Sequence, residues 1–310
     1  MNAHVKSAQV VLNAAYDEAA TPHLSVLIPF YRESPSALLK ALTPIPGVEI
    51  ILLDDGSQQP DLTQDVLSTI DDLALPVKFI TLPANEGRAR GRNRLTTAAR
   101  GAYFLCLDSD MLPDHADFLE RWISVTQDNP AVVFGGFSLL QAPQDKAFAV
   151  HRLMAGKSDC LDAATRSLQP EKYVFTSNLL IRRDVFKAQD FDASFTGWGW
   201  EDVEWAMRVA NDFGVRHIDN TATHMGLDRA ETLARKYEQS VSNFARVIKK
   251  HPDVVAQYPS YKIAKLIRRL PLRGLLRKTV KSIGLNDDMP LKLRALALRV
   301  YRAALYAEVV

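Results

Sequence analysis

Apolar and polar positions follow two alternating patterns in the first third of the chain. Short apolar runs with the length and composition of buried strands alternate with longer stretches in which apolar residues recur at helical spacing. The expected strands are 24–29, 49–54, 77–82 and 103–108, and the expected helices between them are 34–42, 62–72 and 88–99. This alternation predicts an α/β fold with a mostly parallel sheet flanked by helices.

The remaining chain shows a less regular mixture of the same patterns. Apolar runs predict strands at 131–137 and 173–181, a short helix begins at 183–186, and an amphipathic helix is expected over 202–213. We therefore expect three parts: an N-terminal extension over 1–21, an α/β domain over 22–250 with halves 22–113 and 114–250, and a basic helical extension over 251–310.

Two carboxylates follow the strand expected at 103–108. Asp108 and Asp110 flank Ser109, and alternate side chains of an extended segment point the same way. At the carboxyl end of a parallel strand, both acids would lie at the sheet edge where open α/β folds bind ligands. Such oxygen ligands suit Mg²⁺ or Mn²⁺ bridging a diphosphate. The alternative is an Asp-rich turn with a capping role, because a single D-x-D is a weak motif.

A second acidic pair lies behind a turn of glycine and tryptophan, since residues 197–202 read Gly-Trp-Gly-Trp-Glu-Asp. The glycines allow backbone angles closed to other residues. Trp198 and Trp200 offer flat faces of the kind on which pyranose rings stack, and Glu201 and Asp202 can accept a hydroxyl proton. The alternative is core packing by the indoles, with first-turn charges that suit a helix dipole.

The two acidic clusters, in this order, resemble those of inverting glycosyltransferases of family 2 with the GT-A fold. The segment 24–33 resembles the family's first strand and nucleotide-contacting loop, and 50–57 resembles its second strand with the D-D-G-S element. Asn85–Arg88, followed by Arg92 and Asn93, resembles the segment before the D-x-D. The part from 175 to 226, with its T-S-N-L-L-I-R-R run, resembles the acceptor half of the β-1,4-galactosyltransferase type, so the resemblance covers roughly residues 22–230.

This resemblance implies a GT-A, Rossmann-like fold and a metal-dependent, inverting transfer. Asp202 is the implied base and Glu201 the adjacent catalytic and acceptor-binding carboxylate, although two neighbouring acids leave the reverse assignment open. Retaining relatives with a similar acceptor half have Asn in place of this Asp, so the Glu-Asp pair favours inversion. The other implied acceptor-binding residues are Trp198, Gly199 and Trp200. The implied donor-binding residues are Pro29, Tyr31, Glu33, Asp55, Arg88, Asp108 and Ser109.

The resemblance also implies a site for Mn²⁺ or Mg²⁺. Asp110 and His224 are the implied ligands, and Asp108 is either a further ligand or a contact to the donor ribose or a metal-bound water. The family has a ligating methionine three residues before the histidine, where this chain has Thr221, whereas Met225 follows the histidine; the coordination number is left open. The alternative for His224 is a histidine without a functional role.

Composition and charge add information about the compartment and the C-terminal part. The chain has 310 residues, 47% of them hydrophobic, which predicts one large core or one core with a small appendage. Its two cysteines favour a reducing compartment. Residues 1–20 lack a continuous apolar run, and no later stretch reaches the roughly 18 apolar residues of a membrane span, so a cytoplasmic enzyme is expected.

Residues 261–310 carry twelve Lys and Arg against three acids, a net charge of +9 in a chain of net charge +2. Apolar and basic residues recur at helical spacing over 263–270 and 272–278, which is typical of a helix lying on an anionic membrane surface, here the inner face of the membrane. The alternative is a helix packed on the catalytic domain with its basic face in water, because Pro271 and Gly274 interrupt the pattern. A nucleic acid partner is not expected, because no recognised nucleic-acid module is present.

The expected function is the transfer of a sugar from a nucleoside diphosphate, taken as UDP, to a glycan or lipid-linked hydroxyl in polysaccharide or glycoconjugate synthesis. UDP-galactose, UDP-glucose and their N-acetylamino counterparts all fit. One rival is an inactive module that binds a nucleotide sugar. The other is a nucleotidyltransferase, although residues 29–33 contain none of the glycines of its phosphate loop.

Overall fold

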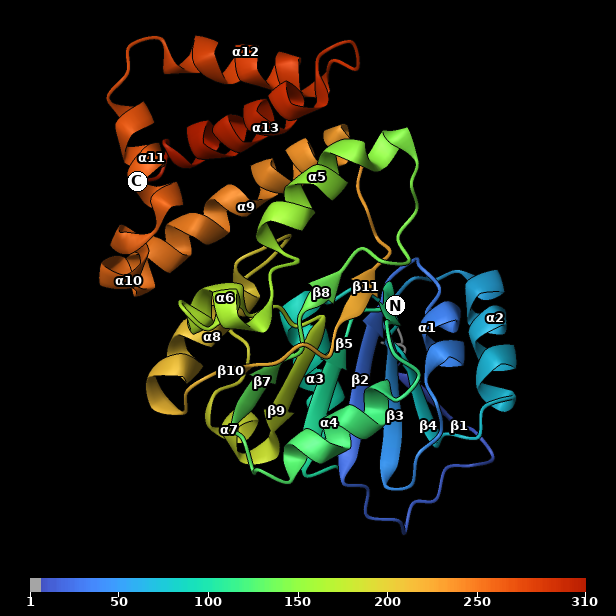
Figure 1. The fold of residues 1–310 in the computed structure, drawn as a ribbon. Helices are drawn as coiled ribbons and strands as arrows, with labels where there is room; N and C mark the ends of the chain where they lie inside the picture. The colour runs from blue at the N-terminus through green and yellow to red at the C-terminus, as the bar shows by residue number, and fades with distance from the viewer. Residues whose placement is uncertain (1–6) are drawn as a thin grey trace, which may run out of the picture.

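The computed structural model describes residues 7–310, in which an eight-stranded sheet forms the centre of the α/β part (Figure 1). Its strand order is β1-β4-β3-β2-β5-β9-β7-β10. Strands β4, β3, β2 and β5 run parallel, whereas β9 is antiparallel to both of its neighbours. The bounds are β1 Gln9–Leu12, β2 Leu24–Phe30, β3 Val48–Asp54, β4 Val77–Thr81, β5 Tyr103–Leu107, β7 Val132–Phe134, β9 Asn178–Arg182 and β10 Arg216–His217.

Helices cover both faces of this sheet, and the alternation of side chains along β2 shows how. Val26 and Ile28 belong to a buried cluster shared with α1, α2 and α4, whereas Leu27 belongs to a second cluster shared with α3, α7 and α8. Burial on both faces explains why these strands are mostly apolar runs. The helices are α1 Ser36–Ala41, α2 Pro60–Asp71, α3 Arg88–Ala98, α4 Phe118–Thr126, α7 Arg183–Ala188 and α8 Glu201–Asp212.

A small second sheet lies beyond the carboxyl end of β5. It has the order β6-β11-β8, with β6 Met111–Pro113, β8 Phe137–Ser138 and β11 Ala222–His224. The antiparallel register pairs His224 with Met111. This pairing brings His224 beside the D-x-D although more than a hundred residues separate the two in the sequence.

A helical layer lies above the carboxyl ends of the parallel strands (Figure 1). Its last helix, α13, packs against α5, α9, α11 and α12 and buries Leu298, Tyr301 and Tyr306. None of the helices in residues 7–310 combines the length and apolar character that crossing a bilayer requires. The helices of this part are α5 Ala149–Ser158, α6 Ala163–Arg166, α9 Ala230–Lys250, α10 Pro252–Gln257, α11 Pro259–Arg268, α12 Arg273–Leu285 and α13 Leu291–Tyr306, with 3₁₀ turns η1 Lys146–Phe148 and η2 Pro170–Tyr173.

The strands and helices expected before residue 113, and the helices expected from residue 183 and over 202–213, are confirmed to within a few residues, whereas two later strands differ. The strand expected at 131–137 is split, because Gly136 has φ +89° and the chain passes from β7 to β8 in the other sheet. The strand expected from residue 173 begins at Asn178, because Pro170–Tyr173 forms a 3₁₀ turn. Residues 9–12 of the expected extension form edge strand β1, and residues 1–6 lie outside the described residues.

Candidate active site

A cavity of about 800 Å³ lies between the carboxyl end of the sheet and the helical layer. Asp108 and Asp110 border it from the end of β5, Trp198 and Asp202 from the start of α8, and His224 from β11. Residues of α11 and α13 line the opposite side. Segments that are far apart in the sequence therefore face one space of the size that ligand sites have.

The end of β3 fixes the loop that leads into α3. The carboxylate of Asp55 accepts hydrogen bonds from the backbone N–H groups of Glu86 (2.8 Å) and Gly87 (3.0 Å). Burial raises the pKa of Asp55, and these two hydrogen bonds offset only part of that increase. Among the residues expected to bind the donor, Arg88 and Asp108 line the cavity. Pro29, Tyr31, Glu33, Asp55 and Ser109 are not among the described residues that line it.

Asp108 is held by the protein at both of its oxygens. Arg92 Nη2 donates to Oδ1 (2.8 Å) and Ser177 Oγ donates to Oδ2 (2.8 Å). Burial alone would raise the pKa of Asp108, but the charges of Arg92 and Arg88 and these hydrogen bonds lower it below its usual range. The carboxylate is therefore ionised and oriented, with less freedom to bind a metal than Asp110 has.

Arg92 connects the two acidic clusters, and sequence reasoning assigned it no role. Its Nη1 lies 3.8 Å from Glu201 Oε1, while its Nη2 binds Asp108. In the described part of the chain, Arg92 Nε and Nη1 and Glu201 Oε2 are buried without a hydrogen-bond partner. Buried unpaired polar atoms are costly. Glu201 lines the cavity, where its unpaired oxygen suits a hydroxyl of a bound substrate, whereas Arg92 lies behind it and is not among the described residues that line the cavity. The available signal was the spacing of Arg88 and Arg92, which puts both on one face of α3.

Asp110 and His224 form a two-residue site. Asp110 Oδ2 lies 3.2 Å from His224 Nε2. Burial lowers the pKa of His224, but the hydrogen bond and the charge of Asp110 more than offset it, so the pKa lies above its usual value. Burial raises the pKa of Glu33, and the negative charge of nearby Asp110 adds to that increase.

The donor set suits a divalent cation whose other ligands come from the substrate. A carboxylate oxygen and an imidazole nitrogen are acceptable to Mn²⁺, and such ions complete their coordination with substrate phosphates and water. Within residues 7–310 no group of three or more His, Cys, Asp or Glu is arranged around a common metal position. Thr221, which stands where the family has methionine, donates its hydroxyl to Asp114 (2.6 Å).

Gly226 preserves the space that Asp110 occupies. A Cβ atom at this position would lie 1.9 Å from Asp110 Oδ2 and 3.3 Å from His224 Nε2. Because the end of a short side chain can move aside, Gly226→Ala should leave the melting temperature within a few degrees of wild type. Displacing Asp110 should weaken Mn²⁺ binding by about tenfold or more. Calorimetric titration of Mn²⁺ in the presence of UDP measures this, and an unchanged affinity would show that Asp110 is not a ligand.

The Gly/Trp turn has the backbone that its sequence predicted. Gly197 and Gly199 have φ values of +75° and +87°, and Trp200, the residue before α8, also lies in the left-handed region at +78°. This strain at Trp200 is offset by packing, because its Nε1 donates to the Tyr306 hydroxyl (2.9 Å) and its ring packs against Phe244 with ring centroids 4.8 Å apart. Trp200 also lines the cavity, and its expected contact with the acceptor stays a prediction.

Asp202 has the properties of a general base. It lies in the first turn of α8, and its Oδ1 accepts from the backbone N–H of Val203 (2.9 Å). Burial, followed by the charge of Glu201, raises the pKa of Asp202 to about 7. Proton transfer is most efficient when the pKa of the base is near the working pH. Glu201 is buried, 3.8 Å from both Arg88 and Arg92.

Comparison with known proteins assigns the chain to a family. The profile described as Glycosyl transferase family 2 matches residues 25–188, which is more than half of the chain. The chain belongs to glycosyl transferase family 2. The match includes the D-D-G-S element and the D-x-D and ends before the Gly/Trp turn. The expected family 2 membership is confirmed, and the β-1,4-galactosyltransferase type of the acceptor half stays a prediction.

Relatives with similar sequences are also named as glycosyltransferases. The chain is 33% identical over 124 residues to polypeptide N-acetylgalactosaminyltransferase 11 of Xenopus tropicalis, covering 36% of this chain and about a fifth (20%) of that protein's length. It is 24% identical over 271 residues to validoxylamine A glucosyltransferase of Streptomyces hygroscopicus subsp. jinggangensis, covering 76% of this chain and 63% of that protein.

The fold agrees with solved structures. The mannosyltransferase PcManGT from Pyrobaculum calidifontis, in complex with GDP-Man and Mn²⁺, superposes with a TM-score of 0.56 and 18% identity over 93% of this chain and 87% of that one. Staphylococcus aureus TarS 1–349 gives a TM-score of 0.53 at 13% identity, over 92% and 89%. The expected α/β, GT-A fold is confirmed.

In this family 2 chain, His151 is a second residue that sequence reasoning did not assign. It comes from α5, and its ring lies 6.1 Å from that of His224. The backbone N–H of Asp228 donates to His151 Nδ1 (2.7 Å). Burial lowers the pKa of His151 to about 4, so it faces the proposed metal site as a neutral ring. His151 lies more than 70 residues before His224 in the sequence and belongs to no motif, so its position beside His224 could not be predicted from the sequence.

The raised pKa of Asp202 predicts the pH dependence of this family 2 enzyme. Below about pH 7 the carboxyl is protonated and cannot accept the acceptor proton, so kcat/KM should fall about tenfold per pH unit. Above that value the carboxylate is ionised and the profile should level off. Initial rates between pH 5 and 9 test this, and a flat profile down to pH 5 would contradict the raised pKa.

Proposed function

We propose that this protein is an inverting glycosyltransferase that transfers a sugar from a UDP-sugar to a hydroxyl of a glycan or glycolipid. The observation that carries the proposal is the convergence of Asp110, His224 and Asp202 on one cavity of about 800 Å³. Two ligands for a divalent ion lie on the donor side, and a carboxylate of raised pKa lies where an acceptor hydroxyl can reach it. These two features would serve the two needs of a single displacement, which are stabilisation of the leaving diphosphate and removal of the acceptor proton.

The proposed reaction is one in-line step. Asp202 accepts the proton of the acceptor hydroxyl as the oxygen attacks the anomeric carbon, and the bond to the nucleoside diphosphate breaks on the opposite face, so the configuration inverts. Glu201, fixed by Arg88 and Arg92, binds another acceptor hydroxyl, and Trp198 lies beneath the sugar ring. Mn²⁺ or Mg²⁺ held by Asp110 and His224 would neutralise the leaving diphosphate.

The choice of metal and donor rests on relatives. The Pyrobaculum calidifontis mannosyltransferase is described with GDP-Man and Mn²⁺, and Staphylococcus aureus TarS with UDP and UDP-GlcNAc. UDP is preferred here because residues 175–226 resemble the β-1,4-galactosyltransferase type. We further propose that residues 22–113 bind the nucleotide, that 114–250 hold the acceptor, and that the helices of 251–310 close the cavity above them.

The test is a panel of UDP-sugars and GDP-mannose with Mn²⁺, each with and without added glycosides. Sugar transfer or slow donor hydrolysis, with release of the nucleoside diphosphate, supports the proposal. Binding without turnover would favour an inactive nucleotide-sugar-binding module. Pyrophosphate release would favour a nucleotidyltransferase.

We also propose that the surface of α11 and α12 lies on an anionic membrane. Its exposed apolar side chains stand among Lys and Arg, and Leu266 and Leu275 are 62% and 61% exposed. Leu266→Glu with Leu275→Glu should lower co-sedimentation with anionic vesicles at least fivefold, because apolar burial is lost and two repelling charges are added. The control is Leu168→Glu, at a position 81% exposed in a different part of the molecule. Equal binding of all three proteins would contradict the membrane proposal.

A further inference from the structure

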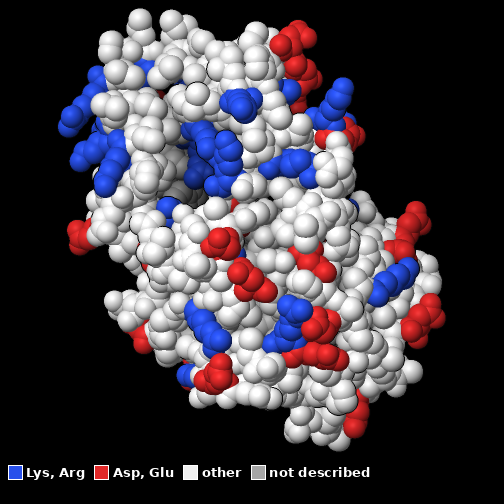
Figure 2. Space-filling model, in the orientation of Figure 1, with Lys and Arg blue, Asp and Glu red and all other residues white. Residues whose placement is uncertain are grey.

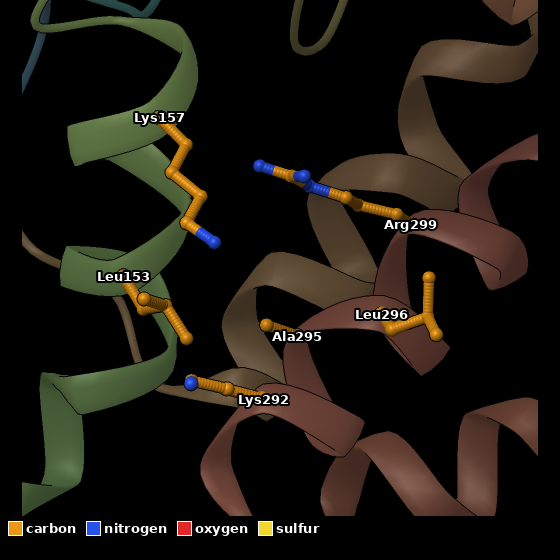
Figure 3. A pocket seen from close by; sticks show the side chains of 6 residues that line it. All are labelled: Leu153, Lys157, Lys292, Ala295, Leu296 and Arg299. Atoms are coloured by element: carbon orange, nitrogen blue, oxygen red, sulfur yellow. The ribbon is translucent and has the colours of Figure 1, made fainter.

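A second, smaller pocket of about 180 Å³ lies between α5 and α13 (Figure 3). Apolar side chains form part of its lining, and three basic side chains stand at its edge. Its lining residues are Leu153, Lys157, Lys292, Ala295, Leu296 and Arg299. Lys157, Leu296 and Arg299 also line the cavity of about 800 Å³, so the two pockets adjoin each other.

The three basic side chains of this pocket have no carboxylate partner. Figure 3 shows Lys157 and Arg299 extending toward one another from opposite helices. Among residues 7–310, no Asp or Glu oxygen lies within 4.0 Å of Lys157, Lys292 or Arg299. Like charges that line one small pocket repel each other, and an anion bound between them offsets this repulsion.

Some basic residues of the same helical layer form ion pairs. Arg294 binds Asp287 (2.6 Å), Lys281 binds Glu238 (2.7 Å), and Arg273 lies 3.3 Å from Glu308. Basic side chains gather over this part of the surface, next to a hollow (Figure 2). The cluster at the pocket is therefore distinguished from other basic residues of 261–310, several of which also form no ion pair, by its concave setting.

One face of α13 connects the pocket to the catalytic centre. Lys292, Arg299 and Tyr306 recur every seven residues, so they lie on the same side of the helix. Tyr306 accepts the hydrogen bond from Trp200, at the start of the helix that carries Asp202. At 1.5 Å per residue, Arg299 is about 10 Å along α13 from Tyr306. Arg302, between them, borders the cavity and lies over the rings of Tyr237 and Tyr306.

We propose that Lys157, Lys292 and Arg299 bind a phosphoryl group of the acceptor, while its hydroxyl lies at Asp202. The guanidinium group of Arg299 can bind two phosphate oxygens, and the two ammonium groups supply further charge. Leu153, Ala295 and Leu296 offer apolar contact to the chain next to that phosphate. This inference rests on the proposed transfer reaction and names its acceptor class: a phosphate-bearing glycan or lipid-linked acceptor.

The test measures the binding of three probes without added metal: inorganic phosphate, farnesyl phosphate and farnesol. Wild type should bind farnesyl phosphate at least tenfold more tightly than farnesol, and Lys157→Gln/Lys292→Gln/Arg299→Gln should abolish most of this difference. Tighter binding of farnesyl phosphate than of inorganic phosphate would support a lipid-linked acceptor. Equal binding of the two would support a soluble phosphoglycan. Both outcomes keep the phosphoryl subsite.

The matched control is Lys262→Gln/Arg269→Gln/Lys278→Gln, which removes the same charge from exposed positions of α11 and α12 and from the turn between them. It should keep the phosphate preference within twofold. The inference would be overturned if wild type did not prefer farnesyl phosphate to farnesol. It would also be overturned if the pocket variant kept this preference, or if the control variant lost it to the same extent.

Mn²⁺-dependent UDP binding by wild type is measured in parallel. Its absence would count against the proposed function, whereas its presence with a failed phosphate test would count against the subsite alone.

Discussion

Asp202→Asn is expected to lower kcat by about 10²-fold or more, the usual scale for loss of general-base assistance. The amide has nearly the same shape and can still accept from the backbone N–H of Val203 through its oxygen, but it cannot take the acceptor proton. The folded structure and the affinity for UDP should therefore be retained. Steady-state kinetics with saturating donor, together with calorimetric titration of UDP, measure the two effects separately.

Glu201→Gln is the matched comparison, because it removes the adjacent carboxylate from the same helix turn. It should raise KM for the acceptor more than it lowers kcat, since Glu201 is proposed to bind a hydroxyl and not to take its proton. It should also lower the pKa of Asp202, because one of the two causes of its elevation is removed, so the acidic limb of the pH profile should move to lower pH. Near-normal turnover by Asp202→Asn, with a collapse in Glu201→Gln, would assign the base to Glu201.

Asp110→Ala and His224→Ala are each expected to reduce Mn²⁺-dependent activity by about 10²-fold. Loss of a residue that only orients a metal ligand typically costs 10- to 100-fold, and loss of a ligand itself should be at the upper end or beyond. Both variants should weaken UDP binding in the presence of Mn²⁺ and leave metal-free UDP binding unchanged. This pattern distinguishes loss of a ligand from damage to the nucleotide site.

His115→Ala is the control for this pair, because His115 is an exposed histidine five residues after Asp110. It should retain wild-type activity and Mn²⁺ affinity. Wild-type activity that survives EDTA would show that the proposed metal site is wrong, whatever the variants do.

The parallel strands could be predicted from the sequence because their burial requires mostly apolar residues within each strand. Leu24 to Phe30 and Val48 to Asp54 are packed on both faces, so the runs are mostly apolar, and the buried polar pair Ser25 and Glu49 is joined by a hydrogen bond (2.6 Å). The break at Gly135 and Gly136 could not be predicted in this way. A Cβ at Gly136 would lie 2.6 Å from the guanidinium of Arg166, a contact made by a residue some thirty positions away.

The candidate site was predictable as separate motifs and less so as a constellation. The resemblance to a known family placed Asp110 beside His224, and the β6–β11 pairing provides the structural reason. Arg92 and His151 were missed because their importance depends on tertiary neighbours: Arg92 lies between Asp108 and Glu201, and His151 lies beside His224. The C-terminal helices showed an apolar stripe and a net charge of +9, but amphipathicity predicts that a face is covered without identifying the covering surface. Arg299 and Arg302 could therefore not be assigned to the cavity from sequence.

The anomeric configuration of the product tests the central claim most directly. The donor that the panel identifies carries its sugar in a known linkage to the diphosphate, and a single displacement with Asp202 as base reverses that configuration. Proton NMR of the isolated product measures the coupling constant of the anomeric proton. We predict a β-linked product from an α-linked UDP-hexose. An α-linked product would contradict the single-displacement account and the role of Asp202 in it.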